Sequence, residues 1–330
     1  MSVLIVTSSD DNDSVERVAE HVRAAGVEAV RFDTDRFPTE TRLACEVDPS
    51  GDRLVLVPPS GEAVDLARVT AVYYRRFAAG RGIPRELDPQ LRRASVEESR
   101  RTVFGLLAAL HAFRLDPVDR VKHAHNKQLQ LRLAREVGLE IPKTLITNDP
   151  EAVRRFAARC PAGLITKMQA SFAVYDEQGR EQVVFTNPLG EEDLADLDGL
   201  ELSPMQFQER VPKAVELRVT VAGRRVFAAA IDSQSSALAS DDWRRDGVGM
   251  IEQWEAHDLP TDVAERLLAV CDHLGLEYGA LDVILTPDGR YVFLEINPVG
   301  EYFWLEEFPG FPISEALAQV LVDPTARRVP

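Results

Sequence analysis

The stretch LDVILTPDGRYVFLEIN, residues 281–297, predicts a β-hairpin that presents three oxygen ligands. β-Branched and aromatic residues flank Asp288-Gly289, a pair typical of a two-residue hairpin turn. Such a turn pairs position 287 with position 290, which places Asp282 opposite Glu295 and puts Asn297 on the same face as Glu295. Opposed carboxylates repel each other unless a cation lies between them, and Mg²⁺ prefers oxygen ligands. The hairpin therefore predicts a magnesium site at these three residues. The alternative is an exposed hairpin with unrelated acids, one of them paired with an arginine.

Length and composition describe an ordinary globular chain. The 330 residues are 45% hydrophobic and 28% charged, which allows a large core and two or three subdomains. Cys45, Cys160 and Cys271 are far apart, which argues against a disulfide framework and fits the cytoplasm. No apolar stretch approaches the roughly 20 residues of a membrane span, so no membrane association is expected. The net charge of −16 disfavours nucleic acid and favours a cationic peptide as partner.

The first residues of the chain indicate an α/β fold. An apolar run at residues 3–6, a helical spacing at 14–25 and a second strand at 27–32 form a β-α-β unit, for which a parallel sheet is the default. The turn at residues 7–13 has no glycine and several carboxylates, which disfavours a Rossmann phosphate cradle. The sequence LDP at 115–117 indicates a domain boundary. We expect three domains, at residues 1–117, 118–205 and 206–330.

Two glutamates, Glu209 and Glu216, lie at the end of one predicted strand and the start of the next. Alternation along residues 216–221 places Glu216, Arg218 and Thr220 on one face of the second strand. The backbone between the strands could pair with an adenine edge, and Glu216 could accept hydrogen bonds from ribose hydroxyls. Taken alone, the segment is equally typical of salt bridges on a solvated strand.

Two lysines are candidate phosphate ligands. Lys167 lies in the apolar strand LITKM, residues 164–168, where it either reaches the sheet edge or meets an anion. Lys127 lies at the start of a predicted helix, where the helix dipole favours a bound phosphate. Each lysine alone is slightly more typical of a surface position than of a ligand.

The order of these residues along the chain resembles that of the ATP-grasp superfamily. The resemblance implies that Mg²⁺-ATP is the cofactor. It implies that the phosphates are bound by Lys127 and Lys167, and the adenine by Glu209, Arg210 and Val211. The ribose would be bound by Glu216, and Mg²⁺ by Asp282, Glu295 and Asn297. It also implies that Arg218, Arg244 and Lys167 act on the phosphates or on an acyl phosphate, with Asn297 close to the nucleotide.

Several longer strings are similar to the microviridin-type peptide maturases, also called graspetide synthetases. They are RFDTDRFPTE (31–40), NKQLQL (126–131), FTNP (185–188), FQERVPKAVELRVTV (207–221), DSQ (232–234), DWRR (242–245) and LEINPVGEYFWLE (294–306). The resemblance implies an ATP-grasp fold with an N-terminal pre-ATP-grasp domain. It implies a ribosomally made precursor peptide, with leader and core, as substrate. Asp or Glu side chains of the core would be phosphorylated and then joined to Thr or Ser as ω-esters, or to Lys as ω-amides.

The acidic run EEDLADLD, residues 191–198, is ordinarily a solvated helix face. Because the family docks a helical leader near this region, the resemblance implies that Glu191, Glu192 and Asp193 meet a basic leader residue. A homodimer is left open. Two other functions compete: an ATP-grasp ligase that adds an amino acid to a protein tail or small acid, and a nucleotide-binding regulatory module without ligase activity. Lys167, Arg218 and the three metal ligands argue against the inactive module.

Overall fold

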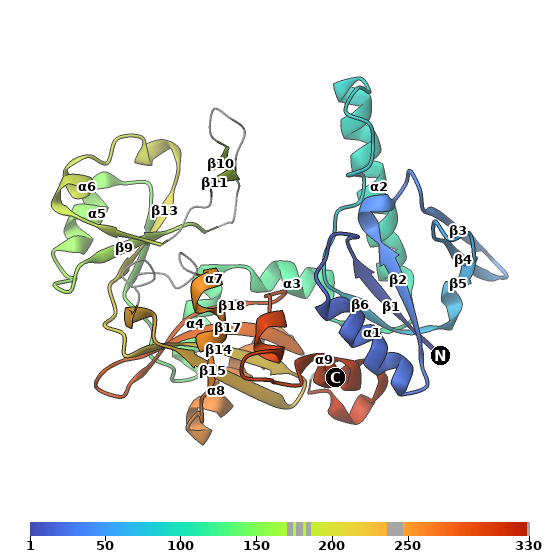
Figure 1. Ribbon diagram of the computed structural model, residues 1–330. Coiled ribbons are helices and arrows are strands. Elements are labelled where there is room, and N and C mark those ends of the chain that lie inside the picture. Colours follow the sequence, from blue (N-terminus) through green and yellow to red (C-terminus); the bar gives the residue numbers. More distant parts are fainter. Residues whose placement is uncertain (170–173, 176–180, 183–185, 236–246, 329–330) are drawn as a thin grey trace.

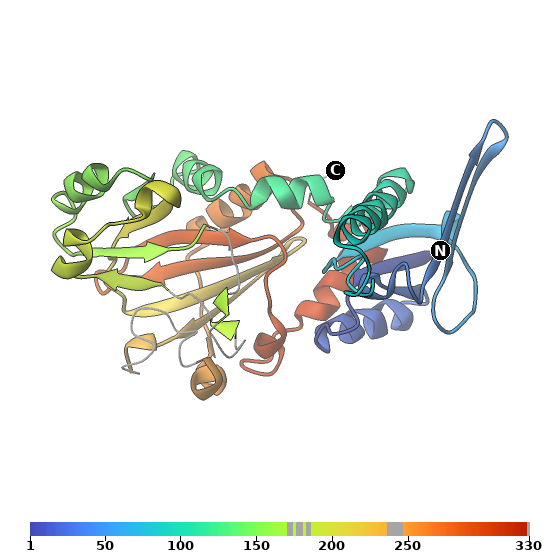
Figure 2. The same ribbon diagram turned by 90° about the horizontal axis from the view of Figure 1, so that it is seen from above.

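The computed structural model of the protein describes residues 1–169, 174–175, 181–182, 186–235 and 247–328 (Figure 1). Its N-terminal part is built on a parallel sheet in the order β2-β1-β6-β7, as predicted. The strands are β1 (Ser2–Thr7), β2 (Glu28–Asp33), β6 (Val69–Tyr74) and β7 (Phe113–Leu115). A second, antiparallel sheet of β3 (Arg42–Asp48), β4 (Gly51–Val57) and β5 (Val64–Asp65) projects from it (Figure 2).

Both faces of the parallel sheet are covered, because every residue of β1 is apolar or small and buried. Helix α2 (Pro89–Ala109) packs on one face, where its Val103 and Leu106 meet Leu4 and Val6. Helices α1 (Ser14–Ala24) and α9 (Ile313–Val322) pack side by side on the other face (Figure 1). The C-terminal helix α9 therefore closes the core of the N-terminal sheet.

The central part is a four-stranded antiparallel sheet in the order β12-β9-β13-β8. Its strands are β8 (Thr144–Thr147), β9 (Leu164–Lys167), β12 (Asn187–Leu189) and β13 (Met205–Glu209), and its helices are α5 (Pro150–Ala157) and α6 (Glu191–Ala195). Its core is small and contains Val153, Phe156 and Phe207. Two short strands, β10 (Val174–Tyr175) and β11 (Glu181–Gln182), pair with each other.

The C-terminal sheet is antiparallel, in the order β16-β15-β14-β17-β18. Its strands are β14 (Val215–Ala222), β15 (Arg225–Ile231), β16 (Glu255–Ala256), β17 (Tyr278–Leu285) and β18 (Tyr291–Asn297). Helices α4 (Lys127–Glu136) and α8 (Thr261–Leu274) cover one face. The remaining described helices are α3 (Val118–Ala124) and α7 (Gly247–Met250). Residues 210–214 link β13 of the central sheet directly to β14 of this one.

A buried carboxylate joins the N-terminal part to the C-terminal sheet. Asp116 follows β7 and accepts the backbone N–H groups of Glu277 and Tyr278, at 2.8 and 3.0 Å, where β17 begins. Burial raises the pKa of Asp116 to about 7. The domain limits at residues 117 and 205 stay predictions. No described helix is long and apolar enough to cross a lipid bilayer.

Candidate active site

The hairpin of β17 and β18 places Asp282 directly opposite Glu295, as predicted. The predicted two-residue turn is wrong, because the backbone N–H of Thr286 donates to the carbonyl of Arg290 at 2.9 Å. Residues 287–289 therefore form a three-residue loop. Gly289 has a φ of +84°, the left-handed conformation that this kind of loop requires at its last position.

A β-bulge restores the pairing that the longer loop would have shifted. Near the turn Val283 lies opposite Phe293, whereas Asp282 lies opposite Glu295, so Leu294 is an extra residue in β18. The bulge also lets Phe293 and Ile296 both join the core beside α4 and α8. Glu295 consequently points to the other face of the sheet, where Asp282 also lies. The predicted pairing of Asp282 with Glu295 thus results from a longer turn and a bulge, whose shifts of the strand register cancel.

Three charged side chains form a row across neighbouring strands of the sheet. Arg218 of β14 lies opposite Asp282 of β17, which lies opposite Glu295 of β18. Nη1 of Arg218 donates to Oδ1 of Asp282 at 2.9 Å, and Nζ of Lys127 donates to Oε2 of Glu295 at 2.5 Å. The Arg218 guanidinium lies over the ring of Trp304, 5.4 Å from its centroid. The structure therefore brings the predicted Lys127, Arg218, Asp282 and Glu295 together.

The face on which the row lies follows from strand alternation. Leu217, Val219 and Val221 pack into the core beside α4 and α8, so Arg218 and Thr220 face the other way, as predicted. Asn297 lies opposite Ala280, two residues beyond Glu295 on the same face. The expected donor set of two carboxylates and one amide oxygen thus shares one face of the hairpin.

The position of Lys127 depends on Gln130, a residue that the sequence did not single out. Gln130 is fully buried in α4, and its amide accepts the backbone N–H of Ile296 at 3.1 Å and donates to the Ile296 carbonyl at 2.9 Å. It also donates to the carbonyl of Ala124 at 2.6 Å. Gln130 thereby fixes the start of α4 against the edge of β18. It lies within the string NKQLQL, but nothing in the sequence distinguishes it from a surface glutamine.

The predicted adenine and ribose ligands lie on either side of the link between the two sheets. Glu209 ends β13, and its carboxylate accepts the backbone N–H of Lys143 at 2.8 Å and pairs with Nζ of Lys143 at 3.0 Å. The backbone N–H of Arg210 donates to the carbonyl of Gly163 at 2.9 Å, and Val211 follows in the link. Across the link, Glu216 pairs with Lys213 at 2.8 Å.

The other predicted site residues lie further from the row. Lys167 ends β9, where it pairs in register with Gln206 of β13. Glu191, Glu192 and Asp193 form the first turn of α6, and Asp193 accepts the backbone N–H of Gly190 at 2.7 Å. One carboxylate oxygen of Asp193 is therefore engaged at the start of the helix, and all three acids are exposed. Arg244 lies outside the described residues.

The two carboxylates of the row, together with Asn297, fit a magnesium ion that is bound partly by the protein and partly by the phosphates of a nucleotide. Within the described ranges, no group of three or more His, Cys, Asp or Glu side chains could hold a metal ion by itself. Asp282, Glu295 and Asn297 supply two carboxylates and an amide, and Mg²⁺ usually completes such a shell with water and phosphate oxygens. Both carboxylates are half-buried and already bonded to a cationic side chain. Two neighbouring carboxylates on one face of the hairpin favour a bound cation between them.

Comparisons with known proteins identify the family. The model of the MvdD pre-ATP-grasp domain matches residues 2–122, and no curated protein matches the chain. The macrocyclase MdnC of Microcystis aeruginosa MRC, solved with precursor peptide MdnA, is 46% identical with a TM-score of 0.89, over 98% of this chain and 100% of that one. The chain belongs to the ATP-grasp ribosomal peptide maturases. The predicted ATP-grasp fold with its pre-ATP-grasp domain is thereby confirmed.

Two further maturases show which ligands such proteins hold. The RiPP-associated ATP-grasp ligase of Chryseobacterium gregarium, in complex with ADP and a leader and core peptide, is 38% identical. Its TM-score is 0.95 over 100% of this chain and 99% of that one. The ATP-grasp ligase PsnB, complexed with a variant of its minimal precursor, Mg and ADP, is 27% identical. It has a TM-score of 0.75 over 98% of this chain and 99% of that one.

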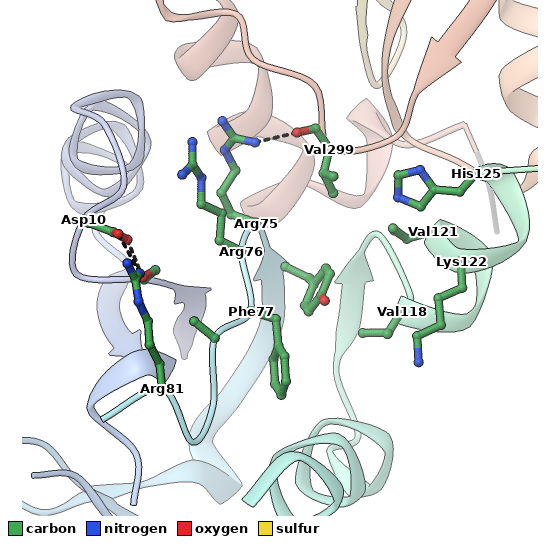
Figure 3. Close-up of a pocket in the computed structure, with 13 residues that line it drawn as sticks. Asp10, Arg75, Arg76, Phe77, Arg81, Val118, Val121, Lys122, His125 and Val299 are labelled. Carbon is green, nitrogen blue, oxygen red and sulfur yellow. Dashed lines mark hydrogen bonds and ion pairs between the residues drawn. The ribbon is translucent and has the colours of Figure 1, made fainter. Parts of the chain in front are cut away.

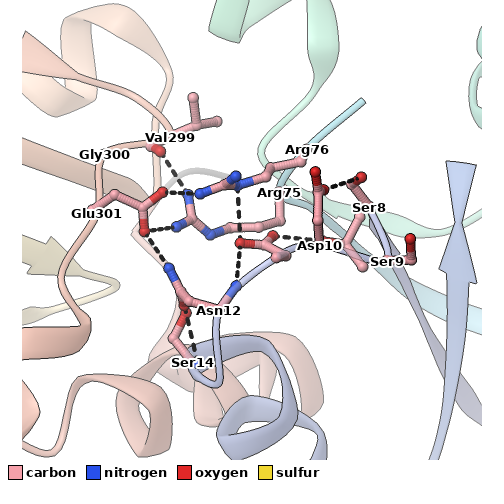
Figure 4. Close-up of polar contacts among 12 residues, drawn as sticks. Ser8, Ser9, Asp10, Asn12, Ser14, Arg75, Arg76, Val299, Gly300 and Glu301 are labelled. Carbon is pink, nitrogen blue, oxygen red and sulfur yellow. Dashed lines mark hydrogen bonds and ion pairs between the residues drawn. The ribbon is translucent and has the colours of Figure 1, made fainter. Parts of the chain in front are cut away.

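A polar network in this maturase links its pre-ATP-grasp domain to the segment after β18, and the sequence did not predict it (Figure 4). Glu301 pairs with Arg75 and, at 2.5 Å, with Arg76, and it accepts the side-chain amide of Asn12 at 2.7 Å. Arg75 also donates to the carbonyl of Val299 at 2.6 Å. Burial raises the pKa of Glu301, but Arg75 and Arg76 outweigh it, and the pKa lies below its ordinary value. Glu301 is therefore ionised at neutral pH and holds the segment that follows Asn297.

Proposed function

We propose that the chain uses Mg²⁺-ATP in the cytoplasm to phosphorylate Asp or Glu side chains of a ribosomal precursor peptide and to close macrocycles from them. The row of Arg218, Asp282 and Glu295, with Lys127 beside it, carries the proposal because it joins metal ligands to cations that suit phosphate. The likeness to MdnC with its precursor peptide, over nearly the full length of both chains, supports a peptide as substrate.

The first step forms an acyl phosphate. A carboxylate oxygen of the peptide attacks the γ-phosphorus of ATP, the bond from that phosphorus to the β,γ-bridging oxygen breaks, and ADP leaves. A bound Mg²⁺ would neutralise charge on the β- and γ-phosphates. Lys127 and Lys167 would hold phosphate oxygens, and Arg218 would stabilise the charge that develops on the transferring group.

The second step closes the ring. A Thr or Ser hydroxyl attacks the acyl carbon, the hydroxyl proton is lost, and inorganic phosphate leaves with the electrons of the broken C–O bond. A Lys amine would give an ω-amide by the same route. Phosphate is a good leaving group, so most of the remaining catalysis is positioning of the two peptide side chains. We assign no residue as the base.

For the remaining roles, the proposal uses the residues that the sequence predicts. Glu209, Arg210 and Val211 would bind adenine, Glu216 the ribose, and Asn297 the metal and nucleotide together with Asp282 and Glu295. Arg244 would contact the phosphates. Glu191, Glu192 and Asp193 would bind the leader, and one carboxylate oxygen of Asp193 also holds the turn at the start of α6. We also propose that the chain forms a homodimer. Light scattering of the purified chain at several concentrations measures its molar mass and tests this proposal.

The test is conversion of a precursor peptide encoded beside the gene, with ATP and Mg²⁺. We expect the loss of one water per ring by mass spectrometry and the release of one ADP for each water lost. The variant Glu295→Gln should lower the turnover rate by about 10²-fold or more, because it removes a metal ligand and a charge from the row.

Asp288→Asn provides the matched control, because Asp288 is an acid of the same hairpin that lies in the exposed turn and pairs only with Arg290 among the described residues. It should keep the activity of the unchanged chain. The proposal would be wrong if both variants kept full activity, or if ADP release required a free amino acid and no peptide was modified.

A further inference from the structure

A cavity of about 410 Å³ lies at the carboxyl ends of strands β1 and β6 (Figure 3). Ser8 and Asp10 follow β1, and residues 75–78 with Arg81 follow β6. β1 pairs with β2 on one side and with β6 on the other, so the chain reverses its direction of winding at this point. In open parallel sheets, ligands bind beyond the carboxyl ends of the strands at such a switch point.

The opposite wall of the cavity comes from the two segments that carry the candidate active site. His125 lies two residues before Lys127, and Val299 lies two residues after Asn297. In Figure 3 the side chains of His125 and Val299 lie across the cavity from Arg81. A molecule in this cavity would therefore touch the segments that hold the expected phosphate and metal ligands.

The cavity is basic although the chain is strongly acidic. Its lining includes Arg75, Arg76, Arg81 and Lys122 but a single carboxylate, Asp10, whereas the whole chain has a net charge of −16. Burial and then Lys127 lower the pKa of His125, so its imidazole is neutral at pH 7. Asp11 and Glu301, which lie outside the lining, pair with Arg75 and Arg76, so Arg81 and Lys122 are the lining cations that favour an anionic occupant.

These cations differ in how firmly the protein holds them. Arg75 is buried and bonded to Val299 and Glu301, although its Nε has no acceptor among the described residues. Arg76 pairs with Asp11 and Glu301. By contrast, Arg81 forms an exposed ion pair with Asp10 at 2.6 Å, and Asp35 is the other carboxylate near it within the described ranges. The Lys122 ammonium lies 4.7 Å from the ring centroid of Phe104, and no carboxylate in the described part of the chain pairs with it. Arg81 and Lys122 are therefore the cations that an incoming anion could engage.

We propose that this cavity binds an acidic side chain of the core peptide and presents it to the phosphate-transfer site. Arg81 and Lys122 contact the carboxylate, while Arg75 and Arg76 remain bonded to Glu301 and support the wall. The volume suffices for one Asp or Glu side chain with its neighbouring residues. The inference rests on the proposed function, because it names the part of the peptide that this cavity receives.

The test compares two variants that break the same ion pair with opposite changes of charge. Arg81→Gln removes a positive charge from the cavity, and Asp10→Asn removes the negative charge that competes with the substrate. We expect the KM for the peptide to rise about three- to tenfold with Arg81→Gln and to fall about two- to threefold with Asp10→Asn, which is the scale of partly exposed charge contacts. The KM for ATP should stay unchanged in both.

Arg101→Gln is the matched control, since Arg101 forms an exposed pair with Glu97 on α2 at 2.8 Å, away from the cavity lining. It should leave both KM values unchanged. If Arg81→Gln and Asp10→Asn shift the peptide KM in the same direction, or if neither shifts it, the cavity does not bind the acidic side chain. Failure of the unchanged chain to modify any peptide would instead overturn the proposed function itself.

Discussion

Two clusters of carboxylates and cations lie at the C-terminal sheet, one on its face and one where β17 begins, and their carboxylates differ in burial. In the row, the side chains of Asp282 and Glu295 are 30% and 22% exposed and pair with the side chains of Arg218 and Lys127. In the second cluster, Asp116 and Glu277 are 4% and 1% exposed and accept backbone N–H groups. One of those N–H groups, at 2.7 Å from Glu277, belongs to Arg328.

The comparison separates residues that can exchange partners from residues that cannot. A half-buried carboxylate bonded to a cationic side chain can turn to a metal ion without leaving a buried backbone group unpaired. The acids of the second cluster cannot move, because each would leave an N–H group without an acceptor in a dry environment. The same residue types therefore act on ligands in one place and hold the fold together in the other.

The largest expected effect comes from a comparison of Arg218 in the row with Arg328 in the second cluster. Arg218→Lys should lower the turnover rate about 10²- to 10³-fold, because an ammonium group replaces neither the planar guanidinium over Trp304 nor its directed bond to Asp282. Because lysine keeps a positive charge beside Asp282, and the hydrogen bond of Arg218 goes to a side chain rather than to a backbone group, the melting temperature should change less than in Arg328→Lys. Steady-state kinetics and thermal unfolding of the same preparation measure both.

Arg328→Lys gives the opposite pattern if the comparison is right. Its guanidinium donates to the carbonyl of Leu276 at 2.5 Å and lies beside Glu277, so the variant should melt several degrees lower while the folded fraction keeps its turnover rate. An equal loss of rate and stability in both variants would contradict the distinction.

The pH dependence of stability should reveal the buried cluster. Because burial raises the pKa of Asp116 from 3.8 to about 7, the folded chain binds more protons than the unfolded chain between these values. The contribution of Asp116 to stability therefore falls as the pH rises from about 4 to 7, by up to about 4 kcal/mol, and is lost above pH 7. Asp116→Asn removes this titration and leaves one of the two N–H groups facing an amide NH2, which is a donor. It should lower the melting temperature most at pH 5 and less at pH 8.

Asp272→Asn is the control for this experiment, since Asp272 is an exposed acid 3.4 Å from Arg328 in the same cluster. Its melting temperature should follow the pH profile of the unchanged chain. A gap between Asp116→Asn and the unchanged chain that stays constant from pH 5 to pH 8 would show that Asp116 does not titrate in this range.

Sequence reasoning was most accurate where one strand or hairpin decides the geometry. Alternation along β14 and the pairing of Asp282 with Glu295 need only local rules, although the bulge at Leu294 shows that the pairing was right for an incomplete reason. The contacts of Gln130, Asp116 and Glu301 join segments more than 150 residues apart. No local pattern marks a polar residue whose partners lie on a segment far away in the sequence, so these contacts required the structure.

The smallest expected effect concerns a third environment, the exposed acids of α6. Replacing Glu191 and Glu192 by Lys should weaken binding of the leader peptide about three- to tenfold at low salt, because exposed charge pairs are weak and screened. Replacing Glu97 and Glu98 by Lys is the control, since these exposed acids of α2 undergo the same change of charge away from α6 (Figure 1) and the affinity should stay unchanged. Fluorescence anisotropy of a labelled leader at two salt concentrations measures the affinity. The difference between the unchanged and reversed chains should shrink at high salt. Equal affinities at low salt would mean that the leader binds elsewhere, and the acids of α6 would then be a solvated face.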